Sequence, residues 1–148
     1  MKQENSAGAL IFYFDKEQFE PNFLLLKYTN YWGFPKGWIE KNETEKEAAI
    51  RETKEETNLD VELIPDFKEI QRWIFRAKDE LIKKECTYFL AEISEDDSKK
   101  VKISNEHEEF IFITLEKSKE YIKIKSNKEM LKKAFDFIKE KKKQKTLF

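Results

Sequence analysis

The stretch that decides the fold runs from Gly37 to Leu59 and reads GWIEKNETEKEAAIRETKEETNL. Within it, Thr44 followed by Glu47 forms a capping-box pattern, in which each residue satisfies a free backbone N–H of the other. This pattern places a helix start near Thr44, and we expect the helix to continue to about Thr57. The acidic residues of this stretch therefore lie on one helix and in the segment just before it.

Carboxylates crowd one face of this expected helix. Glu55 and Glu56 follow Glu52 by three and four positions, and residues at this spacing are neighbours on a helix. Arg51 can reach Glu55 at the i,i+4 spacing, but one guanidinium does not neutralise three carboxylates. The three repel one another unless a cation lies between them. Hard oxygen ligands at close quarters suit Mg²⁺ or Mn²⁺.

The spacing of these residues resembles the signature of the Nudix hydrolases, which act on nucleoside diphosphates linked to another moiety. The signature reads Gly, five residues, Glu, seven residues, then Arg-Glu-aliphatic-any-Glu-Glu-any-Gly-aliphatic. The matching positions here are Gly37, Glu43, Arg51, Glu52, Glu55, Glu56 and Leu59. Thr53 and Asn58 depart from it, but Asn is the best substitute for Gly in the left-handed position after a helix. The competing interpretation, a solvated charge-laced helix, predicts scattered charge and not this register.

The resemblance implies the fold and the metal. It implies an α/β fold of the Nudix type, an α/β/α sandwich with a mixed β-sheet. It implies that Glu52, Glu55 and Glu56 are metal ligands, with Mg²⁺ as the cofactor and Mn²⁺ as the alternative. It also gives Glu43 an accessory catalytic role at the helix start and Arg51 an orienting salt bridge.

Family members often add a carboxylate from outside the signature, as a ligand or as the general base. Glu106 is our candidate for this catalytic role and Glu109 is the second, because both precede an expected strand near the site. The competing interpretation of Glu106 is an exposed loop charge. The number of metal ions and the identity of the base stay open.

The loop before the helix, Phe34-Pro35-Lys36-Gly37, suits a phosphate. Gly37 lets the backbone approach a ligand closely, and Lys36 offers a cation beside the acidic helix. A metal on one side and a lysine on the other would bracket a polyphosphate. A plain surface turn is the competing interpretation of Lys36 and Gly37, and the neighbouring acidic helix argues against it.

Further segments narrow the resemblance to the asymmetrical diadenosine tetraphosphate hydrolases. They are Ser6-Ala7-Gly8, Trp32 to Gly37, Ala48 to Glu52, Thr87 to Glu92, and Glu106-His107. This resemblance implies metal-dependent hydrolysis of diadenosine tetraphosphate to ATP and AMP by water attack. An RNA pyrophosphohydrolase would more typically have Pro-Gln-Gly-Gly where this chain has Pro-Lys-Gly-Trp.

Two alternative functions remain. One is another Nudix pyrophosphohydrolase, acting on RNA 5′ ends or on nucleoside triphosphates. The other is a non-catalytic nucleotide-binding module, against which the intact Glu52, Glu55 and Glu56 argue. The expected partner is a small-molecule nucleotide, and a nucleic acid only under the RNA alternative. No protein partner is implied.

Several aromatic and basic residues are candidates for substrate binding. Adenine binds by stacking on aromatic rings, and the resemblance makes Tyr88 the leading stacking residue, whereas we expect Trp32 and Trp73 to be core residues. Lys84, together with Lys83, would touch distal phosphates or form a solvated hairpin turn. His107 is the only histidine, and it is a candidate substrate contact. The default interpretation is a surface residue without a specific role.

Composition sets further bounds. We expect residues 1–148 to form one domain, long enough to bury roughly two-thirds of its unfolded surface. Charged residues make up 40% of the chain, but the net charge is −1, so global charge argues neither for nor against a polyanionic partner. Cys86 is the only cysteine, which excludes an internal disulfide and favours a reducing cytoplasm. We see no signal-peptide pattern and no membrane-spanning run.

The remaining elements follow from apolar runs and turn residues. We expect a loop over residues 29–41 and a helix from a second capping box at Ser126 and Glu129, with a frayed basic tail from Lys139. We also expect residues 71–75 to pair in a hairpin with the strand 85–93. The expected strands cover residues 6–14, 22–28, 61–75 with a bend at Pro65, 85–93 and 110–115.

Overall fold

The computed structural model describes the backbone of residues 1–146 and the side chains of residues 1–144. Its centre is a seven-stranded sheet in the order β3-β2-β1-β6-β5, with β4 paired to β1 and β7 paired to β2. The sheet is mixed, because β1 and β6 run parallel while the other pairs are antiparallel. The elements are β1 Lys2–Phe14, β2 Pro21–Lys27, β3 Trp32–Gly33, β4 Lys36–Trp38, α1 Glu45–Thr57, β5 Glu69–Ala77, β6 Glu80–Glu92, α2 Glu95–Ser98, β7 Glu109–Ile113, α3 Leu115–Ser118 and α4 Lys125–Thr146.

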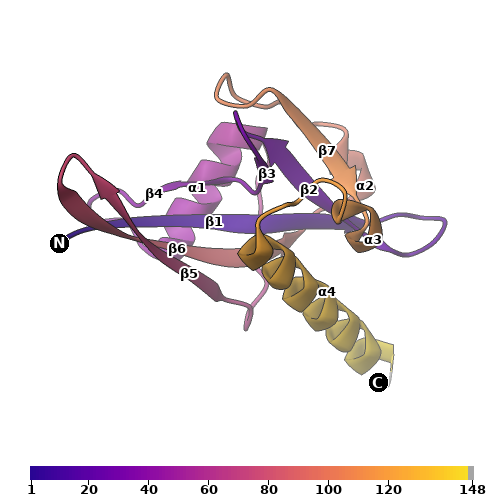
Figure 1. Ribbon diagram of the computed structural model, residues 1–148. Coiled ribbons are helices and arrows are strands. Elements are labelled where there is room, and N and C mark those ends of the chain that lie inside the picture. The colour runs from indigo at the N-terminus through magenta and orange to yellow at the C-terminus, as the bar shows by residue number, and fades with distance from the viewer. Residues whose placement is uncertain (147–148) are drawn as a thin grey trace.

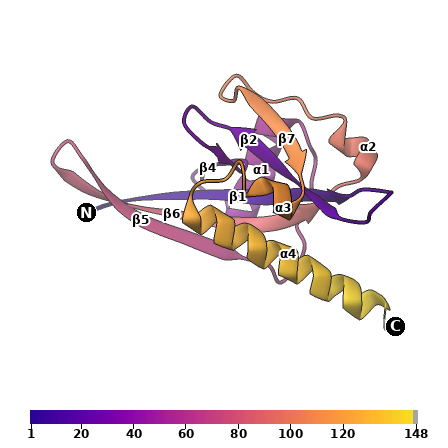
Figure 2. The ribbon, with the colours of Figure 1, turned by 45° about the vertical axis from the view of Figure 1, so that its right-hand side comes forward.

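Helices cover both faces of this sheet, as expected of an α/β/α sandwich (Figure 1). Successive side chains of a strand point to opposite faces of the sheet, so β1 contributes residues to a core on each face. Ala7 packs with Ala48 and Ala49 of α1 on one face. Leu10 and Phe12 belong to the larger core on the other face, together with Leu131, Ala134 and Ile138 of α4. Figure 2 shows α4 lying across the sheet and the β5–β6 hairpin extending away from it.

Helix α1 begins and ends as its sequence predicts. The Glu47 N–H donates to Thr44 Oγ1 at 3.1 Å, and the Thr44 N–H donates to Glu47 Oε1 at 2.9 Å. Asn58 ends the helix in the left-handed conformation, with φ 68°. Thr53 is fully buried, and its hydroxyl donates to the Ala49 carbonyl at 2.7 Å, so the polar residue at this aliphatic position is satisfied.

The strands differ from the expected ranges at several ends. The segment 29–41, expected as a loop, contains β3 and β4, because its backbone pairs with β2 and β1. The expected strand 61–75 is regular only from Glu69, and before it Leu63 makes one isolated bridge to Ala91. The β5–β6 hairpin is confirmed, and its turn is at Lys78-Asp79, where φ is positive. Lys83 and Lys84 therefore lie within β6, not at a turn.

The second capping box is wrong. Helix α4 already begins at Lys125, and the N–H groups of Asn127 and Lys128 both donate to the Ile124 carbonyl at 3.1 Å. Ser126 is consequently inside the helix and does not cap it. Helix α4 continues through most of the expected basic tail, from Lys139 to Thr146, and residues 147–148 lie outside the described part of the chain. Among the described residues, no helix combines the length and the apolar character that crossing a membrane requires.

Candidate active site

Arg51 organises the carboxylates of α1. Its guanidinium donates to both oxygens of Glu43, at 2.6 and 2.9 Å, and to Glu52 Oε1 at 2.8 Å. It also donates to Glu55 Oε2 at 3.1 Å and to the Trp38 carbonyl at 2.9 Å. This bidentate grip on Glu43 lowers the pKa of that carboxyl to about 2. Arg51 thus joins the start of α1, its acidic face and strand β4 in one rigid arrangement.

Gly37 and Glu52 fit together so closely that no larger residue can replace the glycine without movement. A Cβ atom built at Gly37 would collide with the Glu52 carboxylate. Gly37 lies on β4 opposite Ala7 of β1, so the backbone cannot easily withdraw. The glycine of the signature therefore makes room for the first carboxylate of the acidic face.

Glu56 is almost completely buried, with 3% of its surface exposed. The Lys36 N–H approaches its Oε1 at 3.4 Å, and His107 Nε2 lies 3.1 Å from its Oε2. Burial, reinforced by the nearby negative charge of Glu52, raises the pKa of the Glu56 carboxyl to about 8. A buried carboxylate beside a second carboxylate favours the binding of a cation.

His107 is buried behind Glu56, so the default expectation of a surface histidine is wrong. Its ring packs edge-on against Tyr28, with centroids 4.6 Å apart and planes at 88°. Burial lowers the pKa of His107, which keeps the imidazole neutral. Its contact is with Glu56 rather than with open solvent, and its expected role as a substrate contact stays a prediction.

Glu106 is exposed and lines a cavity of about 350 Å³, which we call the acidic cavity. The cavity is lined by Ser6, Lys36, Gly37, Trp38, Glu52, Lys84 and Glu106. Ligand atoms of Glu56, Glu106 and His107 all lie within 4.8 Å of one another. Hard oxygen donors thus converge here, and these residues fit a divalent cation.

Two other candidate carboxylates lie less centrally. The side chain of Glu55 is 57% exposed and is bound to Arg51, at the edge of the cluster. Glu109 forms an ion pair with Lys27 at 3.6 Å on the β2–β7 side. The structure therefore brings together Glu52, Glu56 and Glu106 and leaves Glu109 apart.

A larger cleft of about 630 Å³, which we call the aromatic cleft, lies next to the acidic cavity. Lys36 lines both of them. The wall of the aromatic cleft is formed by Tyr31, Gly33, Phe34, Lys36, Glu69, Ile70, Gln71, Arg72, Trp73, Tyr88, Ile124, Ser126, Asn127, Glu129, Met130 and Lys133. Aromatic rings beside a cationic group suit a nucleotide base and its phosphate.

The expectation that Trp32 and Trp73 are core residues holds in part for Trp32, which is half-buried, and fails for Trp73. Trp32 packs against the larger core and meets Tyr121 edge-on at 5.4 Å. Trp73 is 38% exposed at the cleft, and β5, on which it lies, is the edge strand of the sheet. The ammonium groups of Lys36 and Lys84 lie 5.8 and 5.9 Å from its ring centroid.

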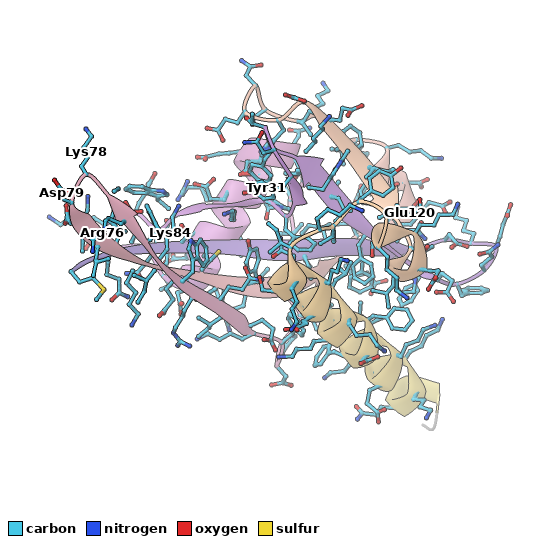
Figure 3. The ribbon with its side chains drawn as sticks, viewed as in Figure 1. Tyr31, Arg76, Lys78, Asp79, Lys84 and Glu120 are labelled. Carbon is cyan, nitrogen blue, oxygen red and sulfur yellow. The ribbon has the colours of Figure 1, made fainter. Side chains whose placement is uncertain are left out.

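Tyr88 and Lys84 line the site from strand β6. Tyr88 lies on the same face as Cys86 and Leu90, but its ring is only 3% exposed and meets Phe34 edge-on. A base can thus reach only a small part of this ring, and the stacking role of Tyr88 stays a prediction. Lys84 lines the acidic cavity. Figure 3 shows Lys84 part-way along the hairpin, whereas Arg76, Lys78 and Asp79 lie at its outer end.

The sequence reasoning missed the wall of the cleft that α4 supplies. The Gln71 amide donates to Asn127 Oδ1 at 2.9 Å, and Lys133 pairs with Glu69 at 3.3 Å. Nothing in the sequence signals these contacts between distant segments. Tyr31 was also missed, although its place beside Trp32, at the start of the glycine-containing loop, could have suggested it.

Comparison with known proteins identifies the class of this site. The model of the NUDIX domain matches residues 3–134. The chain therefore belongs to the Nudix hydrolase family, and its mixed sheet and acidic helix are the fold and signature of that family.

Relatives within the family carry one recurring name. The bis(5′-nucleosyl)-tetraphosphatase [asymmetrical] of Mus musculus is 29% identical over 122 residues, which cover 78% of this chain and 80% of the mouse protein. The protein of the same name from Caenorhabditis elegans is 36% identical over 98 residues, or 64% and 68% of the two chains. The crystal structure of a C. elegans Ap4A hydrolase binary complex matches with a TM-score of 0.77 and 30% identity, over 91% of this chain and 97% of that one.

Proposed function

We propose that this protein hydrolyses dinucleoside polyphosphates asymmetrically, converting diadenosine tetraphosphate into ATP and AMP. The observation that carries the proposal is the position of Lys36, which lines both the acidic cavity and the aromatic cleft. In this proposal the acidic cavity takes phosphate, the aromatic cleft takes a base, and Lys36 lies between the two. The names of the relatives in Mus musculus and C. elegans support the same substrate.

The proposed cofactor is Mg²⁺, with Mn²⁺ as the alternative. Glu52 and Glu56 would hold it, with Glu55 as the third ligand once its carboxylate has left Arg51. When bound, the cation neutralises phosphate oxygens and lowers the pKa of water.

The residues of the chain would then divide the remaining work. Arg51 and Glu43 fix the Glu52 carboxylate, and His107 fixes Glu56. The Lys36 ammonium neutralises a phosphate oxygen and positions the chain of phosphates between the two sites. Glu106, which is exposed and lines the acidic cavity, accepts a proton from the attacking water. Water adds to one phosphorus in line, and the bridging oxygen leaves with the other product.

A substrate panel tests this proposal. The purified protein is incubated with Mg²⁺ and, separately, with diadenosine tetraphosphate, ATP, or RNA that carries a 5′-triphosphate. Ion exchange then resolves the products. We expect the highest kcat/KM on diadenosine tetraphosphate. Efficient release of pyrophosphate from RNA, with little action on the dinucleotide, would replace this function by the RNA alternative, and binding without cleavage would favour a non-catalytic module.

The proposal includes a cytoplasmic location. It rests on Cys86, the one cysteine of the chain, which is buried as a free thiol in the core. Fractionation of cells that express the tagged protein would test the location.

A further inference from the structure

Trp38 presents an exposed ring on a fixed backbone. Its surface is 61% exposed, compared with 38% for Trp73. The backbone beneath the ring is held from two sides, because Trp38 pairs with Ser6 of β1 and its carbonyl accepts a hydrogen bond from Arg51 at 2.9 Å. A large apolar ring that is exposed next to charged groups, on a backbone held in place, is suited to stacking. None of the roles assigned above uses this ring.

Trp38 also connects two hollows. It lines the acidic cavity together with Glu52 and Lys84. It lines a further hollow of about 490 Å³, the outer hollow, whose wall includes Asn5, Ile39 and Thr87. Three hollows are therefore linked in a row: the aromatic cleft and the acidic cavity share Lys36, and the acidic cavity and the outer hollow share Trp38 with Ser6.

This row has the order of a dinucleoside polyphosphate, with a nucleoside at each end and phosphates between them. We infer that Trp38 stacks on the second nucleoside of the substrate, while the aromatic cleft takes the first. The inference rests on the proposed function and adds the residue that recognises the distal end. The side-chain amides of Gln3 and Asn5, which hydrogen-bond to each other at 2.9 Å, give the outer hollow donors and acceptors for the edge of a base.

The experiment compares a substrate that has two nucleosides with one that has a single nucleoside. KM and kcat are measured with Mg²⁺ on diadenosine tetraphosphate and on adenosine 5′-tetraphosphate, for the wild type and for Trp38→Ala, Trp38→Phe and Trp73→Ala. The Trp38 substitutions leave the backbone carbonyl that Arg51 binds. Phe19→Ala is the matched control, because Phe19 is 60% exposed and lies between β1 and β2, away from all three hollows.

We expect Trp38→Ala to raise KM for the dinucleotide at least about five-fold, since stacking on one base is worth about 1–3 kcal/mol. Its KM for adenosine tetraphosphate should change far less, and Trp38→Phe should restore most of the affinity. Trp73→Ala should raise KM for both substrates. An unchanged KM, or an equal rise for both substrates, in Trp38→Ala would overturn the inference while leaving the proposed function intact. A wild type that cleaves neither substrate would overturn both.

Discussion

The acidic cavity takes most of its lining from two short stretches, β4 and the α1 helix that follows it, whereas the aromatic cleft joins segments that are far apart in the chain. Arg51 ties the acidic groups together through residues no more than thirteen positions away. The cleft depends on contacts such as Gln71 with Asn127, which are 56 positions apart. The acidic cavity is thus built on a local motif that Ser6, Lys84 and Glu106 complete from other segments, whereas the aromatic cleft depends on tertiary packing throughout. Substitutions in the two regions should therefore have separable effects on turnover, substrate affinity and stability.

Replacing the buried carboxyl of Glu56, which lies beside Glu52 and Glu106, should abolish most activity without unfolding the protein. For Glu56→Gln we expect kcat to fall at least about a hundred-fold, the scale on which single charge-stabilising groups act in catalysis. Gln keeps the shape of the side chain, and Glu56 already favours the neutral form. Steady-state kinetics and thermal unfolding of the same preparation measure both effects. Near-normal turnover would show that Glu56 is not a metal ligand.

Two glycines offer a matched pair for the same region. Gly37→Ala should displace the Glu52 carboxylate and lower kcat by about ten-fold or more, with little loss of stability, because a side chain can move where a backbone cannot. In Gly8→Ala the new Cβ atom would collide with the backbone carbonyl oxygen of Pro35 instead. This variant should lower the melting temperature by several degrees. Kinetics and thermal unfolding are measured on both variants. A lower melting temperature with normal kcat in Gly37→Ala, and the reverse in Gly8→Ala, would contradict the account of Gly37.

Lysines at the border between the regions should affect catalysis more than folding. Lys36→Ala should weaken kcat/KM, since Lys36 lines both the acidic cavity and the aromatic cleft. Lys84→Ala should have a smaller effect of the same kind, while Lys83→Ala serves as its control, because neighbouring residues on a strand point to opposite faces. Turnover per folded molecule and melting temperature are compared. A large drop in melting temperature with unchanged turnover would mark Lys36 as structural.

The stability of the metal-free protein should depend on pH through Glu56. Its folded pKa of about 8 lies above its ordinary value of 4.5, so the folded state binds more protons between these two pH values. Stability should therefore fall as pH rises from 5 to 8. Thermal unfolding is measured across this pH range in the presence of a chelator, for the wild type and for Glu56→Gln. The difference in stability between the two proteins isolates the contribution of Glu56. Added Mg²⁺ should restore stability more at pH 8 than at pH 6. A difference that is flat with pH would contradict the buried state of Glu56.

Local pattern was enough to predict the acidic helix and its surroundings. The capping box at Thr44, the left-handed Asn58 and the reach of Arg51 are all set within a few residues, and all were confirmed. The second capping box failed, although its pattern looked the same. There the Ile124 carbonyl already accepts the first helical bonds, so the helix begins before Ser126. A capping pattern predicts a possible helix start, and the hydrogen bonds of the neighbouring backbone determine whether the helix begins there.

The cleft could not be predicted because its geometry comes from packing. Trp73 was expected in the core, but whether a strand is central or at an edge depends on the sheet order, which the sequence does not state. His107 was expected at the surface by default, since a lone histidine carries no pattern. Its burial against Glu56 and Tyr28 follows from the loop that returns before β7. The roles of Tyr88, Glu106 and His107 in the site stay predictions.

The identity of the products tests the central claim most directly. Diadenosine tetraphosphate is hydrolysed with Mg²⁺ in water labelled with ¹⁸O, and mass spectrometry identifies each product and locates the label. The account predicts ATP and AMP in equal amounts, with ¹⁸O in only one of them, because a single water attacks one phosphorus next to a nucleoside end. Two molecules of ADP would contradict the asymmetrical placement of the phosphates between the aromatic cleft and the acidic cavity.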